Sequence, residues 1–121
     1  MTITSTRPLL SPSDPAAVQR VNGAGASNIL LIGDHAGDAV PSGVDLGVGA
    51  ADMRRHIAID IGIRPLGIGL AERLDATFLW QAYSRLVIDC NRAPGAPTSI
   101  PPVSDGTAVP GNEGLSDVDR A

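Results

Sequence analysis

The sequence predicts an α/β protein, in which buried strands alternate with a covering helix. Residues 28–33 form a continuous apolar run of strand length, and such runs are typical of strands covered on both faces. Residues 63–74 place apolar side chains three or four positions apart, which predicts one helical face packed on the sheet. Those side chains are Ile63, Leu66, Leu70 and Leu74. Residues 77–82 mix aromatic and apolar side chains, as a second strand would.

The composition limits the class of partner. The chain has 121 residues, enough for one small domain. Its net charge of −4 argues against a nucleic-acid partner, because neutralising phosphates requires clustered positive charge. All nine basic residues are arginine. Codon bias explains this most simply, but a planar guanidinium can also bind a carboxylate through two parallel hydrogen bonds.

The first 27 residues predict an extended or disordered leader, and residues 28–121 the N-terminal portion of a single α/β domain. Residues 16–22 fit either a short helix or an edge strand, and residues 23–26 a turn. That turn lacks the third glycine of a dinucleotide-binding fingerprint. The sequence has no signal-peptide pattern and no apolar run long enough to cross a membrane. Cys90 is its one cysteine, so an internal disulfide is excluded. We therefore expect a cytoplasmic protein with no membrane contact.

The middle of the chain predicts a glycine-rich loop over residues 34–49 and then two helices. The first helix is expected over residues 50–59, with Asp52 as its N-cap. The second should begin near Ile63, with Pro65 in its first turn, where the missing N–H costs nothing. Gly67 and Gly69 weaken it by ~1 kcal/mol each relative to alanine, and they permit close packing.

The last third of the chain is typical of a connection within a larger domain. Leu86 to Ile88 is another short apolar run with the length of a strand, and about thirty irregular residues follow it. Such a long irregular segment rarely ends a compact domain. We therefore expect the N-terminal part of a larger α/β domain, whose incomplete sheet leaves apolar side chains uncovered. These side chains are Leu30, Ile32, Leu86 and Ile88.

Polar residues at the end of the first buried strand suggest a metal site. Asp34, His35 and Asp38 follow the apolar run directly, and His35 and Asp38 have the spacing of an H-x-x-E/D metal pair. A zinc site needs about three ligands of these types and an open position for water. A histidine hydrogen-bonded within a loop is the simpler alternative, and the sequence leaves both open.

Two further groups of polar residues have the chemistry of a binding site. His56 and Asp60 lie four positions apart, and we interpret His56 as an ordinary surface residue but Asp60 as a functional one. Arg85, Asn91 and Arg92 could hold a substrate carboxylate through a fork of N–H donors. Alternatively, Arg85 pairs with Asp89 and Arg92 is solvated.

Four blocks in this order resemble the N-formylglutamate amidohydrolase family. They are Asp34-His35-Ala36-Gly37 with Val40-Pro41, the segment 56–62, the segment 83–92, and Ser104-Asp105-Gly106 with Pro110-Gly111-Asn112. The resemblance implies a mixed-sheet fold similar to zinc carboxypeptidases and aspartoacylase-like deacylases (phosphorylase/hydrolase-like). It also implies hydrolysis of the formyl amide of N-formyl-L-glutamate to glutamate and formate, and a chain about half the usual length.

The same resemblance implies roles for individual residues. His35 would be a metal ligand, with Asp60 as a second ligand and Asp38 as the alternative, and the metal would be divalent, zinc by preference. Asn91 and Arg92 would hold a substrate carboxylate, and Arg85 would line the cleft and stabilise the oxyanion. A further histidine ligand and the proton-shuttling carboxylate would come from beyond Ala121. The alternative is a truncated, catalytically silent domain that binds an acidic small molecule or a partner subunit.

Overall fold

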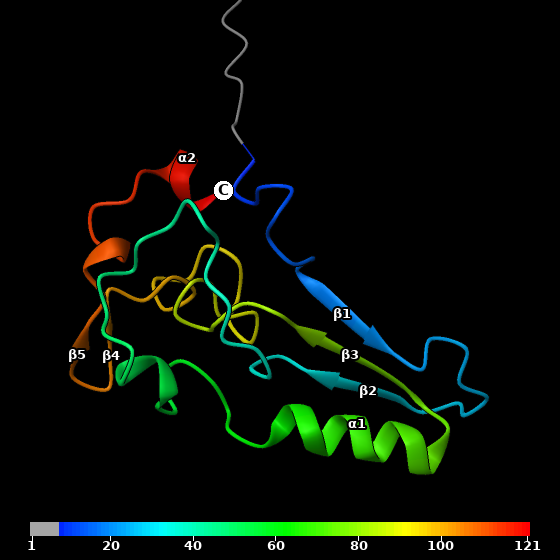
Figure 1. The fold of residues 1–121 in the computed structure, drawn as a ribbon. Helices are drawn as coiled ribbons and strands as arrows, with labels where there is room; N and C mark the ends of the chain where they lie inside the picture. The colour runs from blue at the N-terminus through cyan, green and yellow to red at the C-terminus, as the bar shows by residue number, and fades with distance from the viewer. Residues whose placement is uncertain (1–7) are drawn as a thin grey trace, which may run out of the picture.

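A three-stranded mixed sheet organises residues 8–121, the part of the chain that this computed structural model describes. The central strand β3 (Thr77–Gln81) pairs antiparallel with β1 (Val18–Val21) and parallel with β2 (Leu30–Gly33). Helix α1 (Ile63–Leu74) connects the parallel pair and lies along one face of the sheet (Figure 1). The arrangement confirms the predicted mixed α/β class.

The N-terminal part of the chain contributes more than a leader. Residues 18–21 form the edge strand β1, which decides between the two possibilities that the sequence left open for residues 16–22. The turn at residues 23–26 is confirmed, and the Gly25 N–H donates to the Asn22 carbonyl there. The part of the predicted leader at residues 1–7 lies outside the described residues.

Helix α1 begins at Ile63 with Pro65 in its first turn, as predicted, but it presents a different face to the sheet. Its buried residues are Gly67 and Ala71, and Ile63 packs against the core as predicted, whereas Leu66, Leu70 and Leu74 are exposed. The reason is the aromatic ring of Phe78, which lies so close to Gly67 that a Cβ there would overlap it. Small residues, and not the leucines, let the helix approach the sheet.

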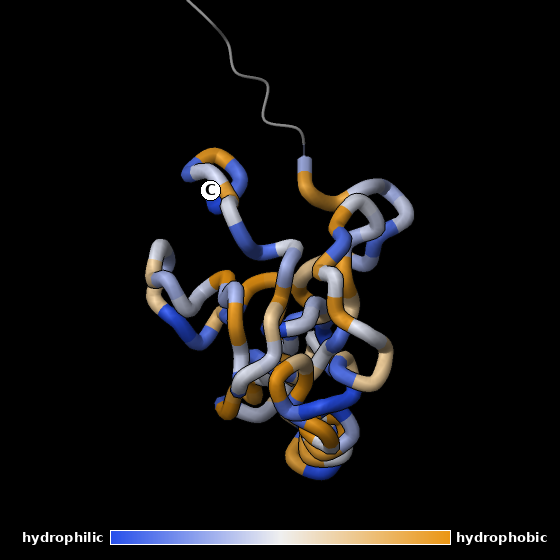
Figure 2. Tube along the Cα trace, turned by 90° about the vertical axis from the view of Figure 1, so that its left-hand side faces the viewer, coloured by the Kyte–Doolittle hydropathy of each residue, from blue (hydrophilic) through white to orange (hydrophobic). Residues whose placement is uncertain are grey.

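The prediction that residues 28–33 are buried on both faces is wrong. Leu31 packs against the core beneath α1, but Leu30 and Ile32 alternate to the other face and are exposed, Ile32 to 76%. Among residues 8–121, helix α1 covers one face of the sheet, and Leu30 and Ile32 stay exposed on the other. The view at 90° shows the helix at the bottom of the molecule (Figure 2).

The predicted helix over residues 50–59 is also wrong. The chain forms only the short 3-10 helix η1 (Asp52–Arg54), and its N-cap is Ala51 without a side-chain hydrogen bond, so Asp52 is not the cap. Extended backbone at Arg55 ends this turn. Arg55 then donates to Asp52 and Thr107, which joins the segment to the C-terminal part of the chain.

A second apolar core forms beside the sheet, and the C-terminal third of the chain closes it. Its buried members are Leu46, Ile57, Ala58, Leu86, Val87 and Val109, with Val40, Val44, Val48 and Met53 packed against them. Apolar residues of the glycine-rich loop 34–49 therefore pack inward, against this core. Leu86, predicted to be uncovered, is fully buried, and residues 85–87 form a turn, so the apolar run 86–88 is not a strand.

The C-terminal third is irregular, as predicted, but it is not an unpacked connection. It contains the hairpin β4 (Val103–Ser104) and β5 (Thr107–Ala108), the 3-10 helix η2 (Pro110–Asn112) and the short helix α2 (Asp117–Arg120). The buried Asn112 amide donates to the carbonyls of Leu86 and Pro101 and so fixes this segment to the second core. Among residues 8–121, no helix is long and apolar enough to cross a membrane.

Candidate active site at the carboxyl ends of the parallel strands

The chemically distinctive residues meet where the parallel strands β2 and β3 end. Asp34 and His35 follow the end of β2, and a parallel bridge between Ala39 and Tyr83 extends the pairing past both strands. The arrowheads of β2 and β3 point toward the same side of the molecule, where the irregular loops gather (Figure 1). Ligands of α/β proteins bind at this end of the strands.

Backbone hydrogen bonds fix three loops against one another at this place. The Asp60 N–H donates to the His35 carbonyl at 2.9 Å, and the Ser84 hydroxyl donates to the Ala58 carbonyl at 2.8 Å. The Arg85 N–H reaches the same Ala58 carbonyl. The loops that carry His35, Asp60 and Arg85 are therefore held together by hydrogen bonds to main-chain carbonyls, two from backbone N–H groups and one from the Ser84 hydroxyl.

The His35 imidazole is buried between two carboxylates. Its Nε2 lies 2.6 Å from Asp89 Oδ1, and its Nδ1 lies 3.2 Å from Asp60 Oδ2. Asp34 Oδ1 lies 3.9 Å from the same Nδ1. Both ring nitrogens therefore face acidic groups, and this fixes the orientation of the ring.

Arg85 lies between the same carboxylates. Its Nη1 donates to Asp60 Oδ1 at 3.4 Å, and its Nη2 donates to Asp89 Oδ2 at 3.2 Å. This confirms the pairing of Arg85 with Asp89 that the sequence offered as one possibility. A guanidinium has five N–H donors, so these two contacts leave donors for a further acceptor.

Asp89 is ionised and accepts three hydrogen bonds. Burial would raise its pKa, but donation from His35 and from the Asn91 N–H, together with the charges of His35 and Arg85, holds the pKa of Asp89 below its usual value. An ionised carboxylate can only accept, so His35 Nε2 carries a proton. Nδ1 is then the ring nitrogen that faces Asp60 and Asp34.

Asp34, His35 and Asp60 form a group with the donor types of a metal site. One ligand atom from each can be chosen so that all lie within 4.8 Å of one another. A lone pair on Nδ1 and a carboxylate oxygen 3.2 Å away repel each other unless a proton or a cation lies between them. One imidazole and two carboxylates suit a divalent cation, and Asp89 occupies the outer position in which a carboxylate orients a metal-binding histidine.

The remaining predicted residues lie outside this group. Asp38 is exposed and lies outside the group, where it borders a shallow depression with Arg64 and Trp80. Asn91 and Arg92 are exposed, and the Arg92 guanidinium donates to the Asn91 carbonyl. His56 is 70% exposed and pairs with Asp105 at 3.1 Å, which confirms its interpretation as a surface residue.

Cys90 lies beside the centre without the properties of a nucleophile. Burial raises the pKa of its thiol, and the nearby charges of Asp34 and Asp89 raise that pKa further. The thiol donates to the Asp34 carbonyl at 3.3 Å. A protonated thiol is a weak nucleophile, so the chemistry of this site belongs to the imidazole and the carboxylates.

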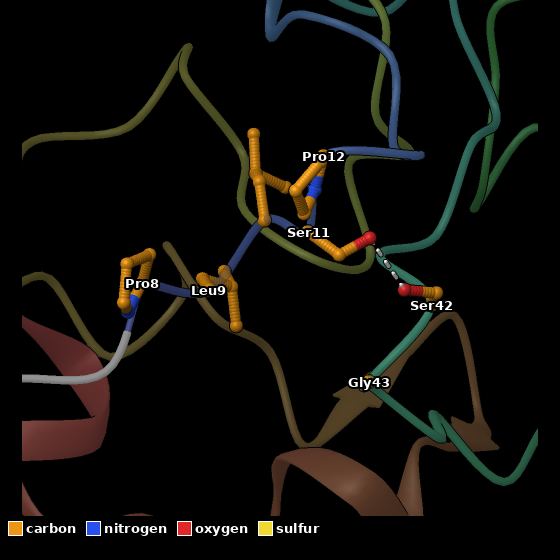
Figure 3. Close-up of a pocket in the computed structure, with 7 residues that line it drawn as sticks. Pro8, Leu9, Ser11, Pro12, Ser42 and Gly43 are labelled. Carbon is orange, nitrogen blue, oxygen red and sulfur yellow. Dashed lines mark hydrogen bonds between the residues drawn. The ribbon is translucent and has the colours of Figure 1, made fainter.

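A separate hollow has a different lining. A pocket of about 580 Å³ is formed by the segment 8–12 with Ser42 and Gly43, and the hydroxyls of Ser11 and Ser42 are 3.1 Å apart there (Figure 3). Prolines, leucines and serines line it, with no histidine, cysteine or carboxylate. It offers no hydrolytic chemistry.

Asp89 was not among the residues predicted for the site, although the sequence contained a signal for it. It follows the apolar run 86–88 directly, just as Asp34 and His35 follow residues 28–33. Asp34 belongs to the first polar group of the sequence, which did not distinguish it as a ligand. Both residues are assigned to the site because loops that are far apart in the sequence meet there in space.

Fold and site together define an α/β protein with a histidine–carboxylate centre at the carboxyl ends of parallel strands. The family model "N-formylglutamate amidohydrolase" matches residues 27–120. The chain belongs to the N-formylglutamate amidohydrolase family, a family of hydrolases.

A solved structure supports the fold independently. A gene product of Agrobacterium tumefaciens is 34% identical in sequence, with a TM-score of 0.87 over 93% of this chain. The match covers 45% of the other protein, so the chain spans less than half the length of that relative. No curated protein matches the chain.

Proposed function

We propose that this chain forms part of a metal-dependent amidohydrolase that removes the formyl group from N-formyl-L-glutamate or a related N-acyl amino acid. The observation that supports the proposal best is the group of Asp34, His35 and Asp60, with Asp89 behind the imidazole. Membership of the family supplies the reaction class. We extend the proposal to a zinc-carboxypeptidase-like fold for the whole protein and to a cytoplasmic location.

In this proposal His35 Nδ1, Asp60 and Asp34 hold a divalent cation, zinc by preference. Asp34, and not Asp38, is the third ligand in this proposal. A bound cation lowers the pKa of water toward neutrality and polarises the amide carbonyl. Asp89 keeps the proton on Nε2, so that Nδ1 presents its lone pair, and it fixes the ring in the orientation that ligation requires.

Arg85 has two functions in the proposal. Its charge offsets that of Asp60 and Asp89, which would otherwise repel each other across the site. Its remaining N–H donors stabilise the negative charge that develops on the formyl oxygen. Asn91 and Arg92 lie on the loop after Asp89, where they hold the carboxylate of the substrate and set its register. The acid that protonates the leaving amine is expected from beyond Ala121.

The two histidines of the chain provide the test. We expect purified protein equilibrated with Zn²⁺ to retain an equimolar amount by elemental analysis. His35→Gln should lose this metal, and His56→Gln should retain it, because His56 lies in an exposed surface pair. In the complete protein, formate release from N-formylglutamate should be lost with His35→Gln alone. Equal metal contents in both variants would contradict the ligand assignment.

A further inference from the structure

A small depression lies at the end of the sheet where β1 and α1 begin and β2 ends (Figure 1). Its volume is about 240 Å³. Its lining comes from β1 and the segment before it, from the loop after β2, from the start of α1 and from the end of β3. No residue of the histidine–carboxylate centre lines it, so its chemistry depends on other side chains.

Main-chain contacts hold the walls of this depression in place. The Ala82 carbonyl accepts from the Ala39 N–H at 3.0 Å, and the Ala82 N–H donates to the Ala17 carbonyl at 2.9 Å. A Cβ at Gly37 would overlap the Ala82 carbonyl, so the close approach of the loop to the strand requires glycine. Asp38 lies between Gly37 and Ala39 and is therefore carried by a backbone that is fixed on both sides.

Arg64 supplies a positive charge to the depression. Its guanidinium carbon lies over the Trp80 ring, 4.4 Å from the ring centroid, which is the geometry of a cation–π contact. Among residues 8–121, no carboxylate forms an ion pair with Arg64. Arg64 is the second residue of α1, whose first turn has no acidic residue and no side-chain cap, so the positive end of the helix dipole adds to its charge. A carboxylate is the group that suits this place.

Asp38 supplies the opposite charge to the same depression. Its carboxylate pairs neither with Arg64 nor with another basic side chain of the described residues. Gln19 lies opposite Trp80 in the register of β1 and β3, and its Nε2 donates to the Ala16 carbonyl at 2.8 Å, which leaves Oε1 as a further acceptor. An ammonium group has three donors and no acceptor, so it matches these oxygens.

The indole of Trp80 has an unused hydrogen-bond donor. Trp80 is 9% exposed, and its Nε1–H has no acceptor among residues 8–121. Buried donors without an acceptor are uncommon in folded proteins, and each needs an explanation. A carboxylate attracted to Arg64 brings an acceptor to the same ring.

We propose that the depression binds a free apolar α-amino acid. Its carboxylate would lie at Arg64, its ammonium group at Asp38, and its side chain against Pro15 and Ala82. One such molecule carries both charges, so it satisfies two charged groups that do not pair with each other. Pockets for drug-sized ligands have roughly 300–1,000 Å³, and the smaller volume here suits a single amino acid. The site is independent of the catalytic proposal.

A ligand with a single charge fits the depression less well. An anion at Arg64 would be repelled by the Asp38 carboxylate, and a cation at Asp38 would be repelled by the Arg64 guanidinium. A zwitterion places each of its charges beside the opposite one. The two kinds of ligand are therefore distinguished by removing one charge of the ligand at a time.

L-leucine is the probe, and the single tryptophan of the chain is the reporter. In the isotope-labelled 121-residue chain, the one indole N–H resonance belongs to Trp80. We expect L-leucine to shift this resonance saturably, with a Kd on the order of 1 mM. N-acetyl-L-leucine lacks the ammonium group and L-leucinamide lacks the carboxylate. Each should bind at least about fivefold more weakly, because one ion pair is lost.

Variants of the two charged residues place the ligand in the depression. Arg64→Gln and Asp38→Asn should each weaken L-leucine binding at least about fivefold, and both side chains are exposed, so neither change should prevent folding. Arg73→Gln on the same helix and Asp45→Asn on the loop 34–49 replace exposed residues outside the depression. These matched controls should bind L-leucine like the unchanged chain.

Three results would overturn the proposal. The first is equal binding of L-leucine by Arg64→Gln and Arg73→Gln, or by Asp38→Asn and Asp45→Asn. The second is equal affinity of the unchanged chain for L-leucine and for N-acetyl-L-leucine or L-leucinamide. The third is a Trp80 indole resonance that does not move at L-leucine concentrations up to about ten times the expected Kd.

Discussion

His35 is held on both sides of its ring, and the two sides have different chemistry. Asp89 is buried behind Nε2, whereas Asp60 and Asp34 lie in front of Nδ1 and are partly exposed. Solvent and ligands can therefore reach the Nδ1 side, while the Asp89 side only orients the ring. This asymmetry is the reason to assign ligation to Nδ1 in the proposed site.

Arg92 is the residue on which substrate specificity can be tested most directly. It is exposed beside the site, and its only contact with a protein acceptor among the described residues is the Asn91 carbonyl, so its guanidinium can turn toward a ligand. In the complete enzyme, we expect Arg92→Ala to lower kcat/KM for N-formylglutamate by roughly ten- to a hundredfold. Arg92→Lys should recover only part of this loss, because it keeps the charge without the planar fork.

The control for Arg92 is a second substrate. A formylated compound that lacks the matching carboxylate should lose much less activity with Arg92→Ala. Equal losses for both substrates would show that Arg92 supports the fold or the metal site and does not recognise the carboxylate.

At the scale of the elements, the contact between α1 and β3 depends on a single missing side chain. A Cβ at Gly67 would overlap the Phe78 ring, whereas a Cβ at Gly69 would meet open space. Gly67→Ala should therefore destabilise the fold by about 1–3 kcal/mol through overpacking. Gly69→Ala should stabilise it by about 0.5–1 kcal/mol, because alanine is the better helix former.

The two glycine variants form a matched pair, since both replace a glycine by alanine within one helix. Chemical denaturation of the unchanged chain and of both variants measures the free energies of unfolding. Changes of the same sign would contradict the packing that we describe.

Asp75 joins two turns at the opposite end of the sheet from the site. Its carboxylate accepts from the Asn22 side chain at 2.9 Å and from the Ala26 N–H at 3.2 Å, and these hydrogen bonds lower its pKa. A folded-state pKa below the unfolded value of about 3.9 gives a stabilisation that is fully present above that pH. It is lost as the pH falls through the folded pKa.

Asp75→Asn removes this titration but keeps a residue type that tolerates the left-handed backbone at this position (φ 47°). We expect the variant to melt below the unchanged chain at pH 7, and the difference to shrink as the pH falls below about 4. Thermal melts between pH 7 and pH 2.5 measure it. A difference that is constant over this range would show that the charge of Asp75 does not contribute.

At the scale of the whole molecule, the uncovered apolar surface limits stability. Leu30, Ile32 and Ile88 are exposed as the sequence predicted, although Leu86 is buried in the second core. We expect residues 1–121 alone to be marginally stable and to associate, because exposed apolar patches and free strand edges promote association. They should also fail to hydrolyse N-formylglutamate.

Calorimetry, sedimentation and a formate assay on the 121-residue chain measure these properties. A sharp cooperative melt from a monomer, combined with deformylase activity, would contradict the prediction. A monomer without activity would contradict its association part alone.

The sequence by itself determined the class of fold, the strand at residues 77–81 and the start of α1, and it singled out His35 and Asp60, which the structure brings within 3.2 Å of each other. These features depend on local patterns: apolar runs, helical spacing, the position of Pro65 and polar residues directly after a strand. Distinctive blocks in a fixed order were also enough to indicate the family, which the family model confirmed.

Tertiary structure decided which faces are buried and which carboxylates meet His35. The leucine spacing in α1 predicted the wrong face, because the shape of Phe78 favours Gly67 and Ala71 at the contact. Asp89 became part of the site because its loop folds back over the end of β2, which local spacing does not encode. Helical period and strand alternation say which side chains share a face, but the partners of that face come from residues far away in the chain.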